Sequence, residues 1–232
     1  MKSPKRTILN VNSKDVKEYG IIEGGKALQK RGTFISLEGI DGCGKTTLKN
    51  ELLSKLGIDY RVLSIREPGG TETSEKIRDL LLDVRNGGIL ARTEAMLYAT
   101  ARCQLVEEVI LPALEEGKLV IADRFIDSTV AYQGFGRGLD IEFLNNLNQL
   151  CTGGVVPDLT LLLDIDPVKA YKRRKGDVLD RLELEGVDFQ TRVREGYLEL
   201  CHQEPERIKC LDASRSVEKL TEMALKQIYD RF

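Results

Sequence analysis

Short runs of apolar residues alternate along the chain with longer segments in which apolar residues recur every three or four positions. The short runs are typical of buried strands, and the longer pattern is typical of helices with one apolar face. The pattern predicts strands at residues 33–38, 60–65, 119–122, 159–164 and 208–211, and helices at residues 44–57, 71–83, 91–116 and 215–231. Strands that alternate with helices favour right-handed crossovers and a parallel sheet covered on both faces. We therefore expect a three-layer α/β fold around a five-stranded parallel sheet.

Residues 1–31 differ from the rest of the chain. They contain eight Lys and Arg residues against three Asp and Glu residues, and the Gly24-Gly25 pair interrupts any helix. We predict that residues 1–31 are an N-terminal extension and that residues 32–232 form one α/β domain. A flexible or loosely packed extension is the simpler interpretation, and an arm that contacts a second subunit is the alternative.

The composition excludes several classes of protein. The formal net charge of −2 provides no basic field for nucleic acid, and no apolar run approaches the roughly 20 residues of a membrane span. The five cysteines are an odd number without a C-x-x-C pair, which disfavours both a disulfide framework and a zinc site. We expect a protein of the reducing cytoplasm that binds neither nucleic acid nor a membrane.

The strongest motif reads GIDGCGKT and begins at Gly39. It matches the phosphate-binding loop G-x-x-x-x-G-K-[ST], with a predicted strand before it and a predicted helix after it. Glycines let backbone N–H groups converge on phosphate oxygens, and the helix N-terminus adds a partial positive charge. Lys45 would reach the β- and γ-phosphates, and the Thr46 hydroxyl would ligate Mg²⁺. The predicted ATP-binding residues are Gly39, Asp41, Gly42, Cys43, Gly44, Lys45, Thr46 and Thr47.

Three further segments follow predicted strands, where open α/β sheets bind their ligands. Arg66 begins the turn REPGG and can clamp a phosphate. Asp123 ends a strand as an acid that can hold Mg²⁺ directly or through water, and Arg124 follows it into the same crevice. The segment 131–138, AYQGFGRG, offers an aromatic ring and an amide for a nucleobase or sugar. The simpler interpretations are a solvated arginine in a turn, a salt bridge that ends a strand, and a loop with a packed tyrosine.

A basic segment at residues 172–183, KRRKGDVLDRLE, follows the fourth predicted strand. Phosphoryl transfer spreads negative charge over the equatorial oxygens, and incoming arginines stabilise that charge. The phosphate-binding loop has no arginine of its own, so we predict a short mobile lid that supplies Arg173, Arg174 and Arg181. An exposed helix face with ordinary solvated charges is the alternative.

Taken together, these segments resemble the bacterial type of thymidylate kinase, a family of P-loop nucleoside monophosphate kinases. From about Thr33 to the C-terminus the ordered set is EGIDGCGKTT, REPGG, LYATARCQL, DRF, AYQGFGRG, PDLTLLLD, DRLE and YLEL. Each segment alone is unspecific, but the ordered set is highly specific. The resemblance implies a P-loop NTPase fold, phosphorylation of dTMP to dTDP by ATP, Mg²⁺ across the donor phosphates, and a homodimer. The extension at residues 1–31 is not part of the family pattern.

The resemblance also implies roles for individual residues. The phosphate of dTMP would be held by Arg66 and Arg124, and Asp41 would approach the 3′-hydroxyl or the metal. The predicted catalytic residues are Lys45, Arg124, Arg173, Arg174 and Arg181, and the predicted metal ligands are Thr46 and Asp123.

For the thymidine part of dTMP, the resemblance places Tyr98 against the thymine ring and Arg102 at its O4 atom. These two side chains are four residues apart and share one helix face. Thr129 and Gln133 would reach the edge of the base, and Tyr132 would pack on the sugar and disfavour a 2′-hydroxyl. The predicted dTMP-binding residues are Asp41, Arg66, Tyr98, Arg102, Arg124, Thr129, Tyr132 and Gln133.

Two other functions stay open on the sequence. One is another P-loop kinase that acts on dUMP or dCMP. An arginine that donates to O4 suits thymine or uracil and rejects the amino group of cytosine, since two donors would face each other. The other is a nucleotide-binding module without turnover, against which the retained Arg66, Asp123, Arg124 and lid arginines argue.

We predict that a chain lacking residues 1–30 keeps its turnover, because every motif begins after this segment. The rate of ADP formation by the truncated and full-length chains would check this. A truncated chain that folds, as judged by its circular dichroism, but has lost activity would contradict the assignment of the extension.

Overall fold

The computed structural model describes residues 31–174, 176 and 180–231. The predicted N-terminal extension, apart from Arg31, lies outside the described residues. So do residues 175 and 177–179 of the predicted lid.

Five parallel strands form one sheet in the order β2-β3-β1-β4-β5. The strands are β1 (Thr33–Glu38), β2 (Val62–Arg66), β3 (Leu119–Asp123), β4 (Leu159–Asp164) and β5 (Ile208–Asp212). All five predicted strands are confirmed, with ends that differ by at most two residues. The chain passes from β1 to β2 at one edge of the sheet, and from β3 to β4 on the other side of β1. The connections from the neighbouring strands β1 and β3 thus leave in opposite directions, and the loops at their carboxyl ends leave a crevice.

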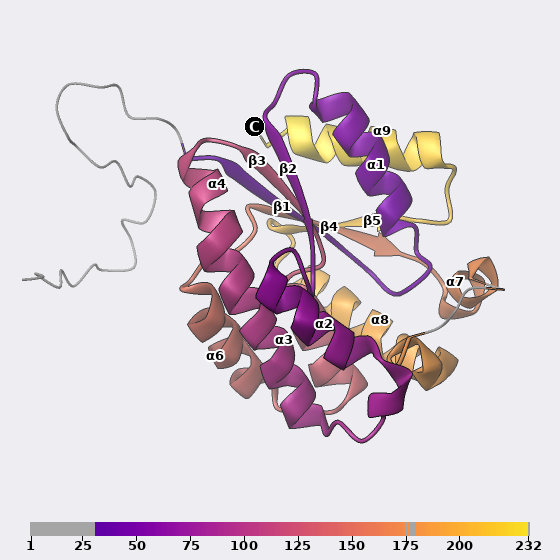
Figure 1. Ribbon diagram of the computed structural model, residues 1–232. Coiled ribbons are helices and arrows are strands. Elements are labelled where there is room, and N and C mark those ends of the chain that lie inside the picture. The colour runs from indigo at the N-terminus through magenta and orange to yellow at the C-terminus, as the bar shows by residue number, and fades with distance from the viewer. Residues whose placement is uncertain (1–30, 175, 177–179, 232) are drawn as a thin grey trace, which may run out of the picture. The chain divides into compact units, whose positions relative to one another are not determined.

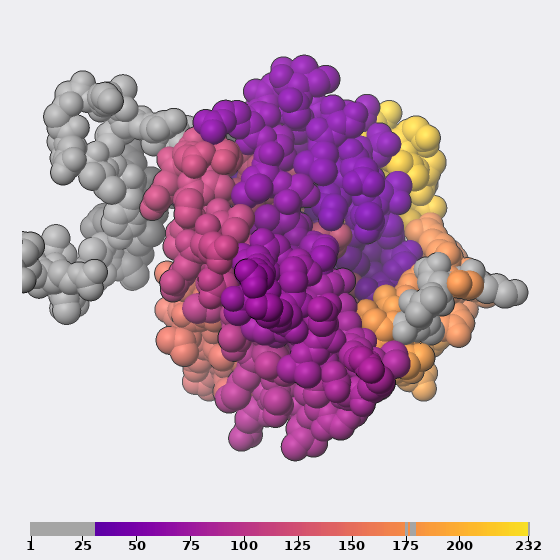
Figure 2. Space-filling model, in the orientation of Figure 1, coloured from indigo at the N-terminus to yellow at the C-terminus, as the bar shows by residue number. Residues whose placement is uncertain are grey.

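Helices cover both faces of the sheet, which confirms the predicted three layers (Figure 1). One face carries α1 (Lys45–Leu56) and α9 (Val217–Tyr229), which also contact each other. The other face carries α3 (Ala91–Leu105) and α8 (Gly186–Gln203), and both α2 (Glu72–Leu82) and α6 (Ile141–Thr152) pack on α3. In the space-filling view, the purple and magenta atoms of α2 and α3 lie in the lower middle of the visible face (Figure 2). The short helical elements are η1 (Val84–Asn86), α4 (Leu111–Glu115), α5 (Ile126–Thr129), α7 (Pro167–Arg173) and η4 (Glu183–Glu185).

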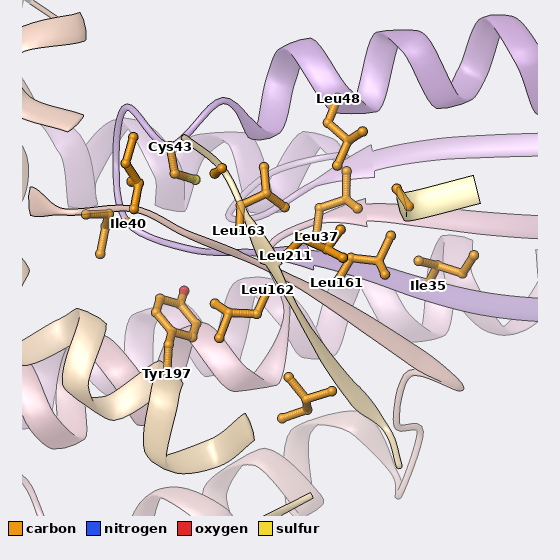
Figure 3. Close-up of a cluster of buried hydrophobic side chains, with 14 of the residues drawn as sticks. Ile35, Leu37, Ile40, Cys43, Leu48, Leu161, Leu162, Leu163, Tyr197 and Leu211 are labelled. Atoms are coloured by element: carbon orange, nitrogen blue, oxygen red, sulfur yellow. The ribbon is translucent and has the colours of Figure 1, made fainter. Parts of the chain in front are cut away.

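The core lies on both sides of the central strands. Leu37 and Leu161 are fully buried, as expected for parallel strands that are covered on both faces. Leu48 of α1 and Tyr197 of α8 approach the sheet from opposite sides (Figure 3). Each fully buried aliphatic side chain contributes about 1.5–3 kcal/mol of transfer free energy. The sheet is therefore a rigid base for the loops that leave its carboxyl edge.

The predicted helix 91–116 is interrupted. Helix α3 ends at Leu105, a π-helical stretch η2 (Val106–Ile110) follows, and α4 continues the path. Pro112 has no N–H to pair with the carbonyl of Glu108, so regular α-helical hydrogen bonding cannot continue through this position.

Residues 131–136 are helical, so the interpretation of the segment 131–138 as a loop is wrong except for its last two residues. Helix α5 passes directly into a second π-helical stretch, η3 (Val130–Gly136), which packs extensively on α8. Gly136 and Gly196 permit this close packing, because a Cβ atom at either position would lie within 2.7 Å of a phenylalanine ring.

Candidate active site

The carboxyl ends of β1, β2 and β3 lie side by side. The register of the sheet places Leu37 and Arg66 on either side of Asp123. A cavity of about 820 Å³ opens along this edge, within the usual range for ligand sites. Lys45, Arg66 and Arg124 all line it. The structure thus brings the phosphate-binding loop and the two arginines into one crevice, as the motifs predict.

The cavity also gathers most of the other predicted site residues. Those that line it are Asp41, Gly42, Cys43, Gly44, Lys45, Thr46, Thr47, Arg66, Tyr98, Arg102, Asp123, Arg124, Thr129, Tyr132, Gln133, Arg173 and Arg174. Two predicted residues, Gly39 and Arg181, are not among the residues that line it.

Gly39 lies at the base of the phosphate-binding loop. Its carbonyl oxygen accepts hydrogen bonds from Lys45 Nζ at 2.8 Å and from Arg124 Nη1 at 3.0 Å. With φ at +138° and a Cβ position only 2.6 Å from the carbonyl oxygen of Leu163, this position requires glycine. Gly39 therefore shapes the loop from below.

Arg181 is placed away from the predicted phosphate crevice. Its Nε donates to the carbonyl of Leu81 at 2.7 Å, and its guanidinium lies 2.7 Å from the carboxylate of Glu94. Glu94 is fully buried, and a buried carboxylate without a cation is very costly. That pairing keeps Arg181 beside Glu94, although its neighbours Asp180 and Leu182 line the cavity.

The phosphate-binding loop leads into α1, whose N-cap residue Gly44 makes no side-chain cap. The N–H groups of the first turn are therefore open to an anion, which the partial positive charge of the helix end favours. Lys45 is buried, and its ammonium group donates to the carbonyls of Gly39 at 2.8 Å and Ile40 at 3.0 Å. A phosphate would have to replace these acceptors.

Arg124 joins the two halves of the cavity. Its guanidinium forms an ion pair with Asp41 of the phosphate-binding loop and donates to the hydroxyl of Tyr132 at 3.0 Å. Tyr132 in turn donates to Asp41 at 2.9 Å. Burial opposes the ionisation of Asp41, but the charges of Arg124 and Lys45 outweigh it and lower its pKa to about 2. Asp41 is therefore a carboxylate at neutral pH.

Two arginines donate to the turn after β2. Arg66 forms an ion pair with Glu75 at 2.9 Å and donates to the carbonyl of Pro68 at 3.1 Å. Arg78 of α2 donates to the same carbonyl at 2.8 Å and also lines the cavity. Burial and the charge of Arg66 lower the pKa of Arg78. Sequence analysis missed Arg78, although a helix that starts directly after REPGG returns toward the same strand end.

Arg102 is held rigidly at the inner end of the cavity. Its guanidinium is 2.7 Å from the carboxylate of Glu67 and donates to Thr129 and Asn148, each at 2.8 Å. A further N–H reaches the carbonyl of Phe125 at 3.1 Å, so every nitrogen of the guanidinium has a protein acceptor. Burial raises the pKa of Glu67, whose Oε1 atom has no hydrogen-bond partner.

Tyr98 and Gln133 complete the inner end of the cavity. Gln133 donates from Nε2 to Glu94 at 3.0 Å, and burial raises the pKa of Tyr98. A neutral aromatic ring and an amide thus border the same space, as expected for a site that accepts a nucleobase.

The opposite end of the cavity was not predicted from the sequence. The loop after β5 and the start of α9 provide Ala213, Arg215, Val217 and Leu220. Arg173 donates to the carbonyl of Ala213 at 3.1 Å, which ties α7 to this loop. This end combines apolar side chains with a cation. It follows β5, which lies on the other side of β1 from β3, whereas Arg102 lies on the β3 side.

The predicted metal ligands are both present in the cavity. Thr46 is exposed, and the carboxylate of Asp123 lies 3.2 Å from Lys49 Nζ. Within residues 31–174, 176 and 180–231, no group of three or more His, Cys, Asp or Glu side chains is arranged to hold a metal ion. Mg²⁺ at a phosphate site usually has one or two protein ligands, with waters and phosphate oxygens as the others, so one hydroxyl and one carboxylate fit it.

Glu38, at the end of β1, is a buried acid that sequence analysis missed. It accepts hydrogen bonds from the N–H of Phe125 at 2.7 Å, from Ser128 at 2.6 Å and from Tyr197 at 2.9 Å. Burial and the nearby charge of Asp127 raise the pKa of Glu38 to about 7. The sequence did carry a signal for this residue: a glutamate ends an apolar strand directly before the phosphate-binding loop.

Comparison with known proteins gives one consistent family. The model of the family described as thymidylate kinase matches residues 37–224. The thymidylate kinase of Thermoanaerobacter sp. (strain X514) is 51% identical over 193 residues, which cover 82% of this chain and 94% of that protein. The thymidylate kinase of Kosmotoga olearia is 48% identical over 198 residues, covering 84% and 94%. A crystal structure of thymidylate kinase from Ehrlichia chaffeensis matches with a TM-score of 0.71 and 32% identity, covering 86% of this chain and 99% of that chain.

We predict that Glu38 makes the stability of the fold depend on pH. A carboxyl group whose pKa rises from 4.5 to about 7 on folding favours the folded state below pH 4.5, and this contribution falls as the pH rises through 7. The Glu38→Gln variant cannot ionise at this position. Urea unfolding of both chains from about pH 5 to about pH 8 should show the unfolding free energy of the wild type falling relative to the variant. A difference that stays constant with pH would contradict the raised pKa.

Proposed function

The chain belongs to the thymidylate kinase family, and from this premise we propose how its cavity carries out the family's reaction, ATP + dTMP ⇌ ADP + dTDP. One observation carries the proposal. The phosphate-binding loop and the arginines that follow β2 and β3 line one continuous cavity at one edge of the sheet. Two nucleotides can therefore lie in it with their phosphates end to end.

The donor ATP would lie at the end formed by α1 and α9. Its β- and γ-phosphates would accept hydrogen bonds from the N–H groups of the loop and from Lys45, in place of the carbonyls of Gly39 and Ile40. Val217 and Leu220 would contact the base, because they provide apolar surface on the far side of the loop.

The acceptor dTMP would lie between α2, α3 and η3. Its phosphate would be held by Arg66, Arg78 and Arg124, which line the cavity next to the loop. Asp41 would face the sugar, together with Tyr132. Binding exchanges the present partners of these cations for phosphate oxygens, and such charge-assisted hydrogen bonds are the strong ones.

The thymine base would lie against Tyr98, with Gln133 at its edge. Arg102 lines the cavity, and its Nη1 would donate to O4 in place of the hydroxyl of Thr129. Arg102 offers only donors, so the amino group of cytosine would meet no acceptor there. This supports dTMP over dCMP as the acceptor. The uracil base of dUMP also has an O4 atom, so Arg102 does not separate dUMP from dTMP.

For the transfer itself, an anionic oxygen of the dTMP phosphate attacks the γ-phosphorus, and the bond to the β-phosphate oxygen breaks as ADP leaves. The attacking oxygen is already charged, so no strong general base is required. Arg173 and Arg174 line the cavity and would stabilise the charge on the transferred group, whereas Arg181 would first have to leave Glu94.

A magnesium ion would be held by Thr46 and Asp123. When bound, it would neutralise charge on the donor phosphate oxygens. Lys49 would then have to turn away from Asp123, with which it is now paired at 3.2 Å.

We further propose a homodimer in a reducing cytoplasm. Helix α3 and the residue before it expose Met96 (47%) and Leu90 (74%), which a second subunit could cover. The five cysteines are free thiols, as a reducing compartment would keep them. No helix in the described part of the chain has the length and apolarity needed to cross a bilayer.

The proposal can be tested by measuring ADP release with dTMP, dUMP, dCMP, AMP and GMP as acceptors. We expect the highest kcat/KM with dTMP, a lower value with dUMP and negligible turnover with dCMP. Turnover that is highest with dCMP or dUMP would favour the alternative kinases, and ATP binding without any acceptor-dependent turnover would favour a binding module.

We predict that Arg124→Ala raises the KM for dTMP and lowers kcat, while the KM for ATP changes little. Losing charge-assisted hydrogen bonds in the acceptor half should reduce kcat/KM for dTMP by about 10- to 100-fold. Steady-state kinetics with each substrate varied in turn would check this. Arg61→Ala, which removes an exposed arginine outside the cavity, is the matched control. Unchanged kinetics in the Arg124 variant would remove this residue from the acceptor site.

A further inference from the structure

We propose that Glu38 is the positioning residue for Arg124 and thereby sets how tightly the cavity holds the acceptor's phosphate. The inference rests on the proposed function and adds a residue to it. Glu38 is fully buried and is not among the residues that line the cavity. It therefore acts on the reaction through Arg124 and does not touch the substrate.

Glu38 fixes the backbone on which Arg124 depends. Arg124 is the only described residue other than glycine with a positive φ, at +73°. For such a residue this conformation is unfavourable and has to be held by its surroundings. The N–H of Arg124 donates to the carbonyl of Leu37 at 3.0 Å, and the next N–H, that of Phe125, donates to Glu38 at 2.7 Å. The end of β1 thus clamps both amides of the turn.

Glu38 also orients the hydroxyl groups that receive the guanidinium. Ser128 and Tyr197 each lie within hydrogen-bond distance of a carboxylate oxygen of Glu38, at 2.6 and 2.9 Å. The same two hydroxyl oxygens accept from Nη1 of Arg124, at 3.3 and 3.2 Å. The two hydroxyl oxygens also lie 2.8 Å from each other. When Glu38 is ionised it only accepts, so a hydroxyl whose single hydrogen points to Glu38 or to the other hydroxyl presents only lone pairs to Arg124.

A neutral amide at position 38 would disturb this arrangement. The glutamine in Glu38→Gln has an NH₂ group that donates to one of the hydroxyls, and that hydroxyl can then point its hydrogen toward Arg124. Two donors would face each other, and the guanidinium would lose its fixed direction. We expect the KM for dTMP to rise about tenfold, the size of effect typical for a hydrogen bond to a charged group, while the KM for ATP stays within about twofold.

A double-mutant cycle tests the inference. The four chains are the wild type, Glu38→Gln, Arg124→Ala and the double variant, each assayed with dTMP and with ATP as the varied substrate at a pH above 7, where Glu38 is ionised. If Glu38 acts through Arg124, adding Glu38→Gln to Arg124→Ala should change the KM for dTMP by less than about twofold. Two effects that multiply in the double variant would overturn the inference, and so would an unchanged KM in Glu38→Gln alone.

Two further variants separate positioning from stability. Ser36→Ala removes a fully buried hydroxyl two residues earlier on β1, bonded to Thr160 at 2.9 Å, and should leave the KM for dTMP unchanged. Tyr197→Phe removes one oriented hydroxyl and should raise that KM by a smaller factor, about threefold, even if Glu38→Gln does not fold. No change in Tyr197→Phe, or an equal rise in Ser36→Ala, would count against the inference. A wild type that does not phosphorylate dTMP would instead contradict the proposed function.

Discussion

The ion pair between Asp41 and Arg124 connects the two halves of the cavity, and the arrangement of the site depends on it. Asp41 belongs to the loop after β1 and Arg124 to the turn after β3, so the pair bridges two neighbouring strands at their carboxyl ends. Both side chains are mostly buried, where an unpaired charge would be very costly. The pair therefore ties the arginine after β3 to the phosphate-binding loop.

The same rule extends to the other cations of the cavity. Lys45 is bonded to loop carbonyls, Arg66 to Glu75, Arg173 to the carbonyl of Ala213, and Arg174 to Glu183 at 2.6 Å. A phosphate bound as proposed would replace these acceptors, so its affinity would be a difference between two sets of hydrogen bonds. The present partners keep the cations in place without a ligand, at some cost in affinity.

Sequence patterns predicted the fold and most of the lining of the site, because both depend on short-range signals. Apolar periodicity marked the strands, and the motifs after β1, β2 and β3 had to meet because parallel strands end at one edge. What the sequence did not show depends on tertiary packing. Arg78 belongs to no local motif. Glu38 begins the segment EGIDGCGKTT, but its partners Phe125 and Tyr197 lie far along the chain, and so does Glu94, the partner of Arg181. Helix α6 was not predicted, although the sequence carries local signals for both of its ends. Asp140 caps its start, and Gly153 caps its end.

The environment of Glu94 bears on the role proposed for Arg181 at the transferred phosphoryl group. Glu94 is fully buried, yet it has three partners: Arg181 at 2.7 Å, Arg137 at 3.2 Å and Gln133 at 3.0 Å. If Arg181 turned toward the phosphates, Glu94 would keep one cation and one amide. The remaining ion pair would limit the cost of the exchange, and the charge that develops during transfer would offset it. Glu94 thus pairs with Arg181 without depending on it alone.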